Sequence, residues 1–195
     1  LTPVYAGFQM YLMPPPYFLQ RPYRWLDAIS RYQINVSGGP NFAYEYCVKR
    51  VRKDQLQNLQ LSQWQTAFCG AEPINPETFR RFDDYFRECG FQYKSFIPCY
   101  GLAESTLLVT SVNKDEMPGT AFFAKQGLEK SRVIPSTAGD DSRELVGCGG
   151  EGLGLKVRIV NPDTNEEVGA DEIGEIWVFG GSVAKGYWGK PDLSK

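Results

Sequence analysis

Amphipathic helices alternate with short apolar segments over the first 112 residues, and this alternation restricts the fold more than any other feature of the sequence. Apolar residues at helical spacing predict helices from Pro22 to Tyr32, from Phe42 to Val51 and from Pro76 to Cys89. Such an alternation is typical of a parallel sheet flanked by helices. We therefore predict an α/β fold for residues 1–112, with strands at Ile34–Val36, Trp64–Cys69, Ser95–Cys99 and Leu107–Val112.

The alternation ends after residue 112, and the rest of the chain divides into two further parts. Residues 113–146 are rich in Gly, Pro, Lys, Asp and Ser, which predicts an irregular excursion longer than an ordinary connection. In residues 147–195, apolar segments at 155–160 and 173–179 enclose a polar turn, which predicts a β-rich hairpin or partial barrel. We expect this last part to belong to the same domain as residues 1–112.

Composition and charge argue against several classes of protein. The 21 basic and 23 acidic residues are interspersed and give a net charge of −2, so we expect no nucleic-acid partner. No apolar run approaches the roughly 20 residues of a membrane span and no leader opens the chain, which predicts a cytoplasmic protein without a membrane span. Five cysteines without a C-x-x-C pair disfavour disulfides and zinc. The absence of histidine excludes a Ser-His or Cys-His nucleophile within this chain.

The segment with the clearest chemistry follows a predicted buried strand and reads Tyr100-Gly101-Leu102-Ala103-Glu104. Ligands of open α/β sheets bind at such strand ends. A tyrosine ring can stack on a base, a glycine lets the backbone approach a ligand, and a carboxylate can bind Mg²⁺. Taken alone, the segment also fits a turn with a solvated glutamate.

A second turn of this kind lies thirty residues upstream and reads Gly70-Ala71-Glu72-Pro73. It also follows a predicted strand and precedes a helix. If the two strands are neighbours in the sheet, both turns reach one crevice, and backbone-rich turns in a crevice suit a nucleotide. The context of the two turns therefore favours a binding site over two unrelated loops.

Two downstream motifs read Gly174-Glu175-Ile176-Trp177-Val178 and Gly186-Tyr187-Trp188. With the two turns, they stand in the order seen in the adenylate-forming superfamily, and the chain resembles the second half of that superfamily's large N-terminal domain from end to end. The resemblance implies an ATP or AMP pocket formed by Gly70, Ala71, Glu72, Tyr100, Gly101, Leu102 and Ala103. It also implies that Glu104 binds Mg²⁺ and acts in catalysis.

Within the superfamily, the chain is most similar to the fatty acyl-AMP ligases. The carriers of this resemblance are Tyr100–Glu104, the segment Ser37–Ala43, and an insertion that ends in Leu145-Val146-Gly147-Cys148-Gly149. One departure is the start of the insertion, Ala121–Lys125, which lacks the aspartate and tyrosine residues expected there. The resemblance implies activation of a fatty acid as acyl-adenylate and transfer to an acyl carrier protein or a module of a polyketide or lipopeptide synthase.

Two further assignments remain open at the level of sequence. Ser37, Gly38, Gly39 and Phe42 would border the acyl tunnel, because small residues leave room for an alkyl chain, or they form an ordinary strand-to-helix turn. The basic run Lys49–Lys53 would steer an acidic carrier protein, although a solvated helix face is the simpler interpretation.

The resemblance also places some of the required groups outside the chain. A phosphate-binding loop is expected before Leu1, and a ribose-binding acid and a lysine after Lys195. We therefore expect a central fragment that keeps part of a binding site and is inactive alone. An acyl-CoA synthetase is the alternative enzyme, and a noncatalytic lipid- or nucleotide-binding module is the alternative from another class.

Overall fold

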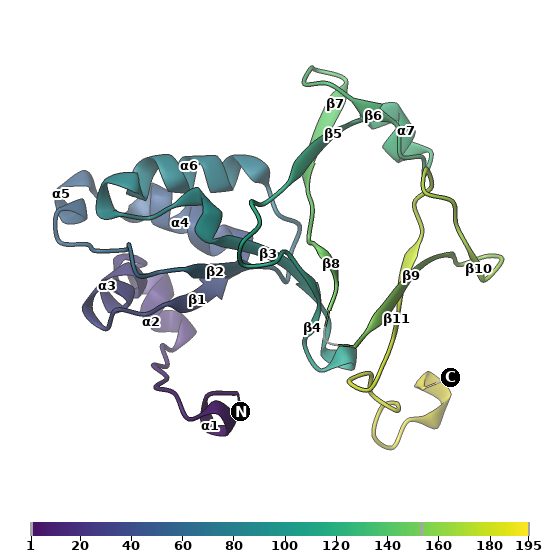
Figure 1. Ribbon diagram of the computed structural model, residues 1–195, viewed down its shortest axis with the longest axis horizontal. Coiled ribbons are helices and arrows are strands. Elements are labelled where there is room, and N and C mark those ends of the chain that lie inside the picture. The colour runs from purple at the N-terminus through teal and green to yellow at the C-terminus, as the bar shows by residue number, and fades with distance from the viewer. Residues whose placement is uncertain (1, 153, 195) are drawn as a thin grey trace.

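The computed structural model describes residues 2–152 and 154–194, which form one five-stranded sheet and two three-stranded sheets (Figure 1). In the large sheet, the first three strands run parallel to one another and the last two are antiparallel to their neighbours. The strands lie in the order β1 (Val36–Gly39), β2 (Thr66–Cys69), β3 (Phe96–Gly101), β4 (Leu108–Ser111) and β8 (Gly150–Glu151). The predicted α/β class is confirmed.

The strand predicted at Leu107–Val112 is present as β4, but it runs antiparallel to β3 instead of extending the parallel order. The reason is the connection between the two strands, which spans only residues 102–107. A parallel pair needs a crossover of roughly a dozen residues or more, whereas a short turn suffices for an antiparallel pair. The sheet is therefore mixed.

The three predicted helices are present as α3 (Tyr23–Arg31), α4 (Asn41–Arg50) and α6 (Pro76–Phe86). The last is specified by local signals at both ends. The side chain of Asn75 accepts a hydrogen bond from the Glu77 amide at 3.0 Å, and Pro76 occupies the first turn. After one 3₁₀ turn, Gly90 adopts a φ of 88° and ends the helical segment, as predicted.

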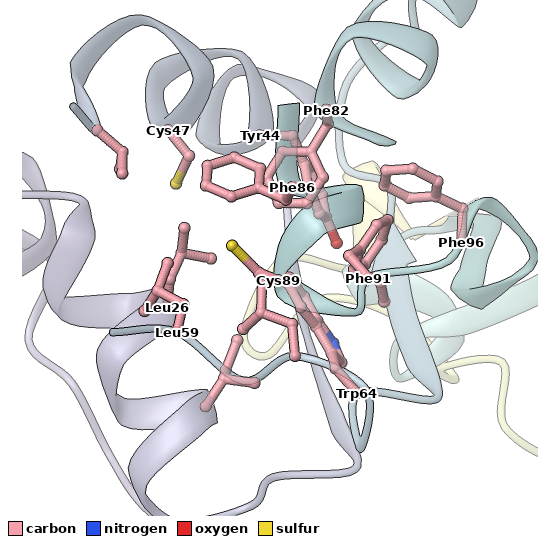
Figure 2. Packing of buried hydrophobic residues seen from close by; sticks show 14 of the residues in the cluster. Leu26, Tyr44, Cys47, Leu59, Trp64, Phe82, Phe86, Cys89, Phe91 and Phe96 are labelled. Atoms are coloured by element: carbon pink, nitrogen blue, oxygen red, sulfur yellow. The ribbon is translucent and has the colours of Figure 1, made fainter. Parts of the chain in front are cut away.

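The hydrophobic core lies between these helices and the parallel strands and is dominated by aromatic rings (Figure 2). Tyr44 is fully buried, stacks on Trp64 and meets Phe82 edge to face. Its hydroxyl donates a hydrogen bond to the carbonyl of Phe68 at 2.7 Å, so the buried polar atom is satisfied. The helical spacing predicted an apolar face of Phe42, Ala43, Tyr46, Cys47 and Val51 and left out Tyr44, whereas Phe42 is 47% exposed.

Strand β1 lies two residues later than predicted. The prediction placed Ile34–Val36 in a strand and treated Ser37-Gly38-Gly39 as a break, but these three residues pair with β2. A Cβ atom on Gly38 would lie 2.1 Å from the carbonyl oxygen of Phe68. Glycine is needed here because β1 and β2 approach each other so closely. The role of Gly38 is therefore in strand pairing and not in a turn.

The remaining helices are short. Among the described residues, no helix is long and apolar enough to cross a membrane. The short helices are α1 (Thr2–Ala6), α2 (Pro15–Gln20), α5 (Lys53–Leu56) and α7 (Lys125–Glu129).

The segment expected to be an irregular excursion is instead an ordered antiparallel sheet. It consists of β5 (Thr120–Ala124), β6 (Pro135–Ser136) and β7 (Ser142–Val146), with α7 following β5. The prediction failed because most side chains of these strands are exposed or half-buried, so no alternation of apolar and polar residues marks them. This sheet is tied to the α/β body by an ion pair between Glu144 and Arg80 of α6.

The predicted β-rich hairpin is present as β9 (Lys156–Asn161) and β11 (Glu175–Phe179), with β10 (Glu166–Glu167) beside β9. Within residues 2–152 and 154–194, the strands do not close into a barrel. The hairpin contacts the β5–β7 sheet, because the Val133 amide donates to the Asp171 carbonyl at 2.7 Å and the Ile173 amide to the Ser131 carbonyl at 3.0 Å. Figure 1 shows the hairpin joined to the α/β body through this sheet and through the turn after β3.

Candidate active site

The two turns singled out in the sequence lie side by side at the carboxyl ends of neighbouring parallel strands. Cys69 of β2 is in register with Pro98 of β3, so Gly70–Pro73 lies beside Tyr100 and Gly101 at one edge of the sheet. Tyr100 and Gly101 were expected in the turn, but they form the end of β3 and pair with β4. Ala71–Pro73, Tyr100 and Gly101 line one open cavity of about 960 Å³, which we call the strand-end cavity. Its opposite wall is β7 and the residues after it, up to Cys148. This volume is in the range of small-molecule sites.

Close backbone packing fixes both turns. A Cβ atom on Gly70 would lie 2.7 Å from the carbonyl oxygen of Cys99, and one on Gly101 would lie 1.8 Å from that of Leu107. A residue other than glycine with a positive φ lies in or just after each segment, Ala71 with φ of 67° and Thr106 with φ of 70°. Such backbone strain clusters at functional sites, because the surrounding structure must hold it in place.

Glu72 has a structural partner that the sequence did not reveal. Its carboxylate accepts a hydrogen bond from the backbone amide of Phe42 at 2.6 Å, in the first turn of α4. An anion at this position satisfies a free helix amide and is favoured by the helix dipole. In addition, the Asn75 amide donates to the side chain of Asn41 at 3.1 Å, so the starts of α4 and α6 hold each other.

Glu104 lies in a second, smaller cavity of about 400 Å³, which we call the Glu104 cavity. Tyr187 donates its hydroxyl hydrogen bond to Glu104 Oε1 at 2.5 Å, and the Ala184 amide donates to the Glu104 carbonyl at 2.7 Å. The hydrogen bond from Tyr187 lowers the pKa of Glu104, so its carboxylate is charged at neutral pH. The cavity is also lined by Ala103, Lys185 and Ser194.

The Glu104 cavity offers one charged carboxylate, so among divalent cations we compare it with the ligands that Mg²⁺ uses in proteins. Mg²⁺ is usually held by one or two carboxylates together with phosphate oxygens and water. Among the described residues, no three His, Cys, Asp or Glu side chains come together as a metal cage, so the chain offers Glu104 as a single charged ligand. This arrangement leaves room for phosphate oxygens to complete the coordination.

The predicted acyl-site residues line a third open cavity of about 870 Å³, which we call the aromatic cavity. Ser37, Gly38 and Gly39 of β1 line this cavity. Phe42, at the start of α4, lines it as well. The Trp25 indole donates to the hydroxyl of Ser37 at 2.9 Å. The aromatic and strand-end cavities meet at the hydrogen bond between Glu72 and Phe42.

The predicted site residues are therefore divided among three cavities. The structure brings Ala71, Glu72, Tyr100 and Gly101 together, and Gly70 packs beneath them against Cys99. Leu102 lines none of the three cavities; it precedes the 3₁₀ turn that carries Ala103 and Glu104.

Sequence analysis missed Tyr187 as a partner of Glu104. The motif Gly186-Tyr187-Trp188 was noticed as a family feature, but nothing in the sequence linked it to a carboxylate 83 residues away.

Several known proteins are similar to this chain over nearly all of its length. The chain is 43% identical to a medium-chain fatty acid–acyl carrier protein ligase of Moorena producens over all of its length and 33% of that protein. It is 37% identical to a long-chain fatty acid–AMP ligase of Mycobacterium tuberculosis over 98% of the chain and 32% of that protein. It superposes with a TM-score of 0.95 on the crystal structure of a fatty acyl-adenylate ligase from L. pneumophila, with 45% identity over 99% of the chain and 34% of that structure.

The chain thus spans about a third of the length of the relatives it matches. The family description that matches the sequence is that of AMP-binding enzymes, and the match extends over residues 1–188. The chain belongs to the AMP-binding enzyme family.

Proposed function

We propose that this chain is part of a longer fatty acyl-AMP ligase, which activates a fatty acid with ATP and passes it to an acyl carrier protein of a polyketide or lipopeptide synthase in the cytoplasm. The observation that carries the proposal is the meeting of Ala71, Glu72, Tyr100 and Gly101 in one cavity at the ends of two parallel strands. Such a strand-end crevice is where open α/β sheets bind nucleotides. The relatives at 43% and 37% identity are named for fatty-acid ligation.

Each cavity has a role in the proposed reaction. In the strand-end cavity, the ring of Tyr100 stacks on adenine, and the backbone around Gly70 and Ala71 borders the adenosine. In the aromatic cavity, the small residues Ser37–Gly39 leave space for the alkyl chain. In the Glu104 cavity, the charged carboxylate helps to hold Mg²⁺, which would neutralise the phosphate charge that develops in the transition state.

The first step joins the fatty acid to the nucleotide. A carboxylate oxygen of the fatty acid attacks the α-phosphorus of ATP, and the bond between the α-phosphorus and the bridging oxygen breaks as pyrophosphate leaves with the electron pair. In the second step, the phosphopantetheine thiol of the carrier protein attacks the acyl carbonyl and AMP leaves. In both steps the residues of this chain bind and orient the reactants, which lowers the barrier by fixing their geometry.

The test is exchange of labelled pyrophosphate into ATP by the full-length enzyme in the presence of fatty acids. We expect fatty-acid-dependent exchange in the wild type and a loss of about 10²- to 10³-fold in Glu104→Gln, because one charged contact of the transition state is removed at constant size. Tyr5→Phe, an exposed tyrosine on α1 that lines none of the three cavities, is the control and should exchange like the wild type.

Chromatography of the products separates the alternative enzymes. Efficient synthesis of acyl-coenzyme A by the wild type would show an acyl-CoA synthetase. An absence of exchange with every fatty acid would leave only a binding module.

A further inference from the structure

Tyr187 holds the carboxylate of Glu104 from a part of the chain that is distant in sequence. Its hydroxyl lies 2.5 Å from Glu104 Oε1. Within residues 2–152 and 154–194, no side-chain hydrogen bond reaches the other oxygen, Oε2. Tyr187 is thus the side chain from another part of the described fold that holds this carboxylate, which also accepts a hydrogen bond from the backbone of Glu104.

Tyr187 is itself held in place by its own neighbours. The hydroxyl of Ser194 accepts a hydrogen bond from the Tyr187 amide at 2.8 Å and donates one to the Lys190 carbonyl at 2.9 Å. Gly186 has a φ of 146°, and a Cβ atom there would lie 2.6 Å from Ser194. The glycine therefore permits the contact that orients the tyrosine.

The turn that carries Glu104 is not stabilised by its own residues alone. Thr106 has a strained backbone with φ of 70° and ψ of −56°, and the hydroxyl of Ser105, which is 2% exposed, has no hydrogen-bond partner among the described residues. Hydrogen bonds between this turn and residues 182–184 help to hold it in place. The Thr106 hydroxyl donates to the Ser182 carbonyl at 2.9 Å, and the Ala184 amide donates to the Glu104 carbonyl. The loop 182–187 therefore sets where Glu104 lies.

We propose that Tyr187 is a positioning residue for metal binding: its hydroxyl fixes Oε1 of Glu104 so that Oε2 faces the Glu104 cavity and binds the magnesium ion of Mg²⁺-ATP. This inference rests on the proposed function of Glu104. Groups that hydrogen-bond a metal-binding carboxylate orient it, and their removal typically costs 10- to 100-fold in metal affinity or activity. Tyr187 does not touch the ion and acts only through Glu104.

The experiment measures Mn²⁺ binding to the full-length enzyme, with Mn²⁺ as a paramagnetic substitute for Mg²⁺. The free ion is followed by electron paramagnetic resonance in the presence of α,β-methylene-ATP, which cannot be cleaved. We expect Tyr187→Phe to raise the dissociation constant of Mn²⁺ about tenfold. The matched control is Tyr85→Phe, which removes a hydroxyl that donates to the Val51 carbonyl at 2.7 Å, far from the cavity in sequence and structure.

A double-mutant cycle with Glu104→Gln decides between the possible outcomes. The proposal holds if Glu104→Gln and Tyr187→Phe each weaken Mn²⁺ binding and the second change adds nothing to the first. It is overturned if Glu104→Gln weakens binding while Tyr187→Phe leaves it unchanged or tightens it, and the proposed role of Glu104 then survives. If Glu104→Gln itself has no effect, the metal-binding role of Glu104 fails and this proposal fails with it.

Discussion

A single methyl group added at Gly101 should reduce the activity of the site by more than the lost stability of the fold explains. In the Gly101→Ala variant, the new Cβ atom would lie 1.8 Å from the carbonyl oxygen of Leu107, whereas ordinary contact begins at 3.4 Å. The obstacle is backbone, so no side chain can rotate away. Overpacking of this kind costs about 1–3 kcal/mol, and the lower entropy of the unfolded chain returns at most about 1 kcal/mol.

The structure therefore predicts a net loss of about 2 kcal/mol in the free energy of unfolding, since the methyl group pushes β4 away from β3 at the irregular pair Gly101–Leu108. For a chain of this size, that loss lowers the melting temperature by roughly 4–8 °C. In the full-length enzyme, the same movement displaces Glu104. A misplacement of about 1 Å can reduce the rate about 10²-fold, so adenylate formation should fall by more than the loss of folded protein explains.

The assay compares Gly101→Ala with Gly150→Ala by thermal unfolding, followed by circular dichroism. Gly150 lies in β8 of the same sheet, and a Cβ atom there would meet nothing within 4 Å. We expect Gly150→Ala to unfold at the wild-type temperature or slightly above it. If both variants unfold at the same temperature, the close packing at Gly101 does not hold the turn and the reasoning is wrong.

Two further predictions concern the β5–β7 sheet. Burial raises the pKa of Glu144. Hydrogen bonds from Arg80 and Thr120 and the charge of Arg80 together lower it by more, so the net shift of the pKa is downward. The ion pair with Arg80 is thus expected to stabilise the fold by about 0.5 kcal/mol above the unfolded-state pKa of about 4.3 and to lose this effect as the pH falls through the lower folded-state value. Denaturant unfolding of Glu144→Gln should then differ from wild type at pH 7 and converge with it below pH 4; an unchanged difference would contradict the assignment. Replacing residues 125–141 of the full-length enzyme by a two-residue turn keeps Ala124 paired with Ser142 but removes the contacts at 131–133 with the β9–β11 hairpin. We expect acyl-AMP formation to persist and acyl-coenzyme A formation to rise, because a brace worth about 2 kcal/mol would restrict the thiolation-competent state roughly thirty-fold; chromatography that finds both products unchanged would reject this role.

Elements with local signals could be predicted from the sequence. Helix α6 shows this clearly, because Asn75 caps it, Pro76 lies in its first turn and Gly90 ends the helical segment, all within sixteen residues. The ends of β2 and β3 were also expected at one edge of the sheet, since alternating helices and strands bring strand ends together there, although Tyr100 and Gly101 belong to β3 and not to the predicted turn. These inferences need only the order of elements along the chain.

Features that depend on distant contacts could not be predicted. The pairing of Gly38 with Phe68 decides that residues 37–39 are strand and not turn, and the sequence around Gly38 alone resembles a turn. The strands β5 and β7 are stabilised by each other while much of their surface remains exposed, so they lack an apolar pattern. Tyr187 and Glu104 meet only after the whole β-rich part has folded back.

The candidate site contains two turns, one after β2 and one after β3. Each turn is held in place by a segment from another part of the fold. The turn after β2 is anchored where Glu72 binds the amide of Phe42, and Phe42 lines the aromatic cavity. The turn after β3 is anchored by Tyr187 and the loop before it. Since Glu72 lines the strand-end cavity as well, any movement of its carboxylate changes the capping of α4 and thereby the wall of the neighbouring cavity. The strand-end cavity and the aromatic cavity are therefore linked through one hydrogen bond, and the Glu104 cavity is linked to the loop 182–187 through another.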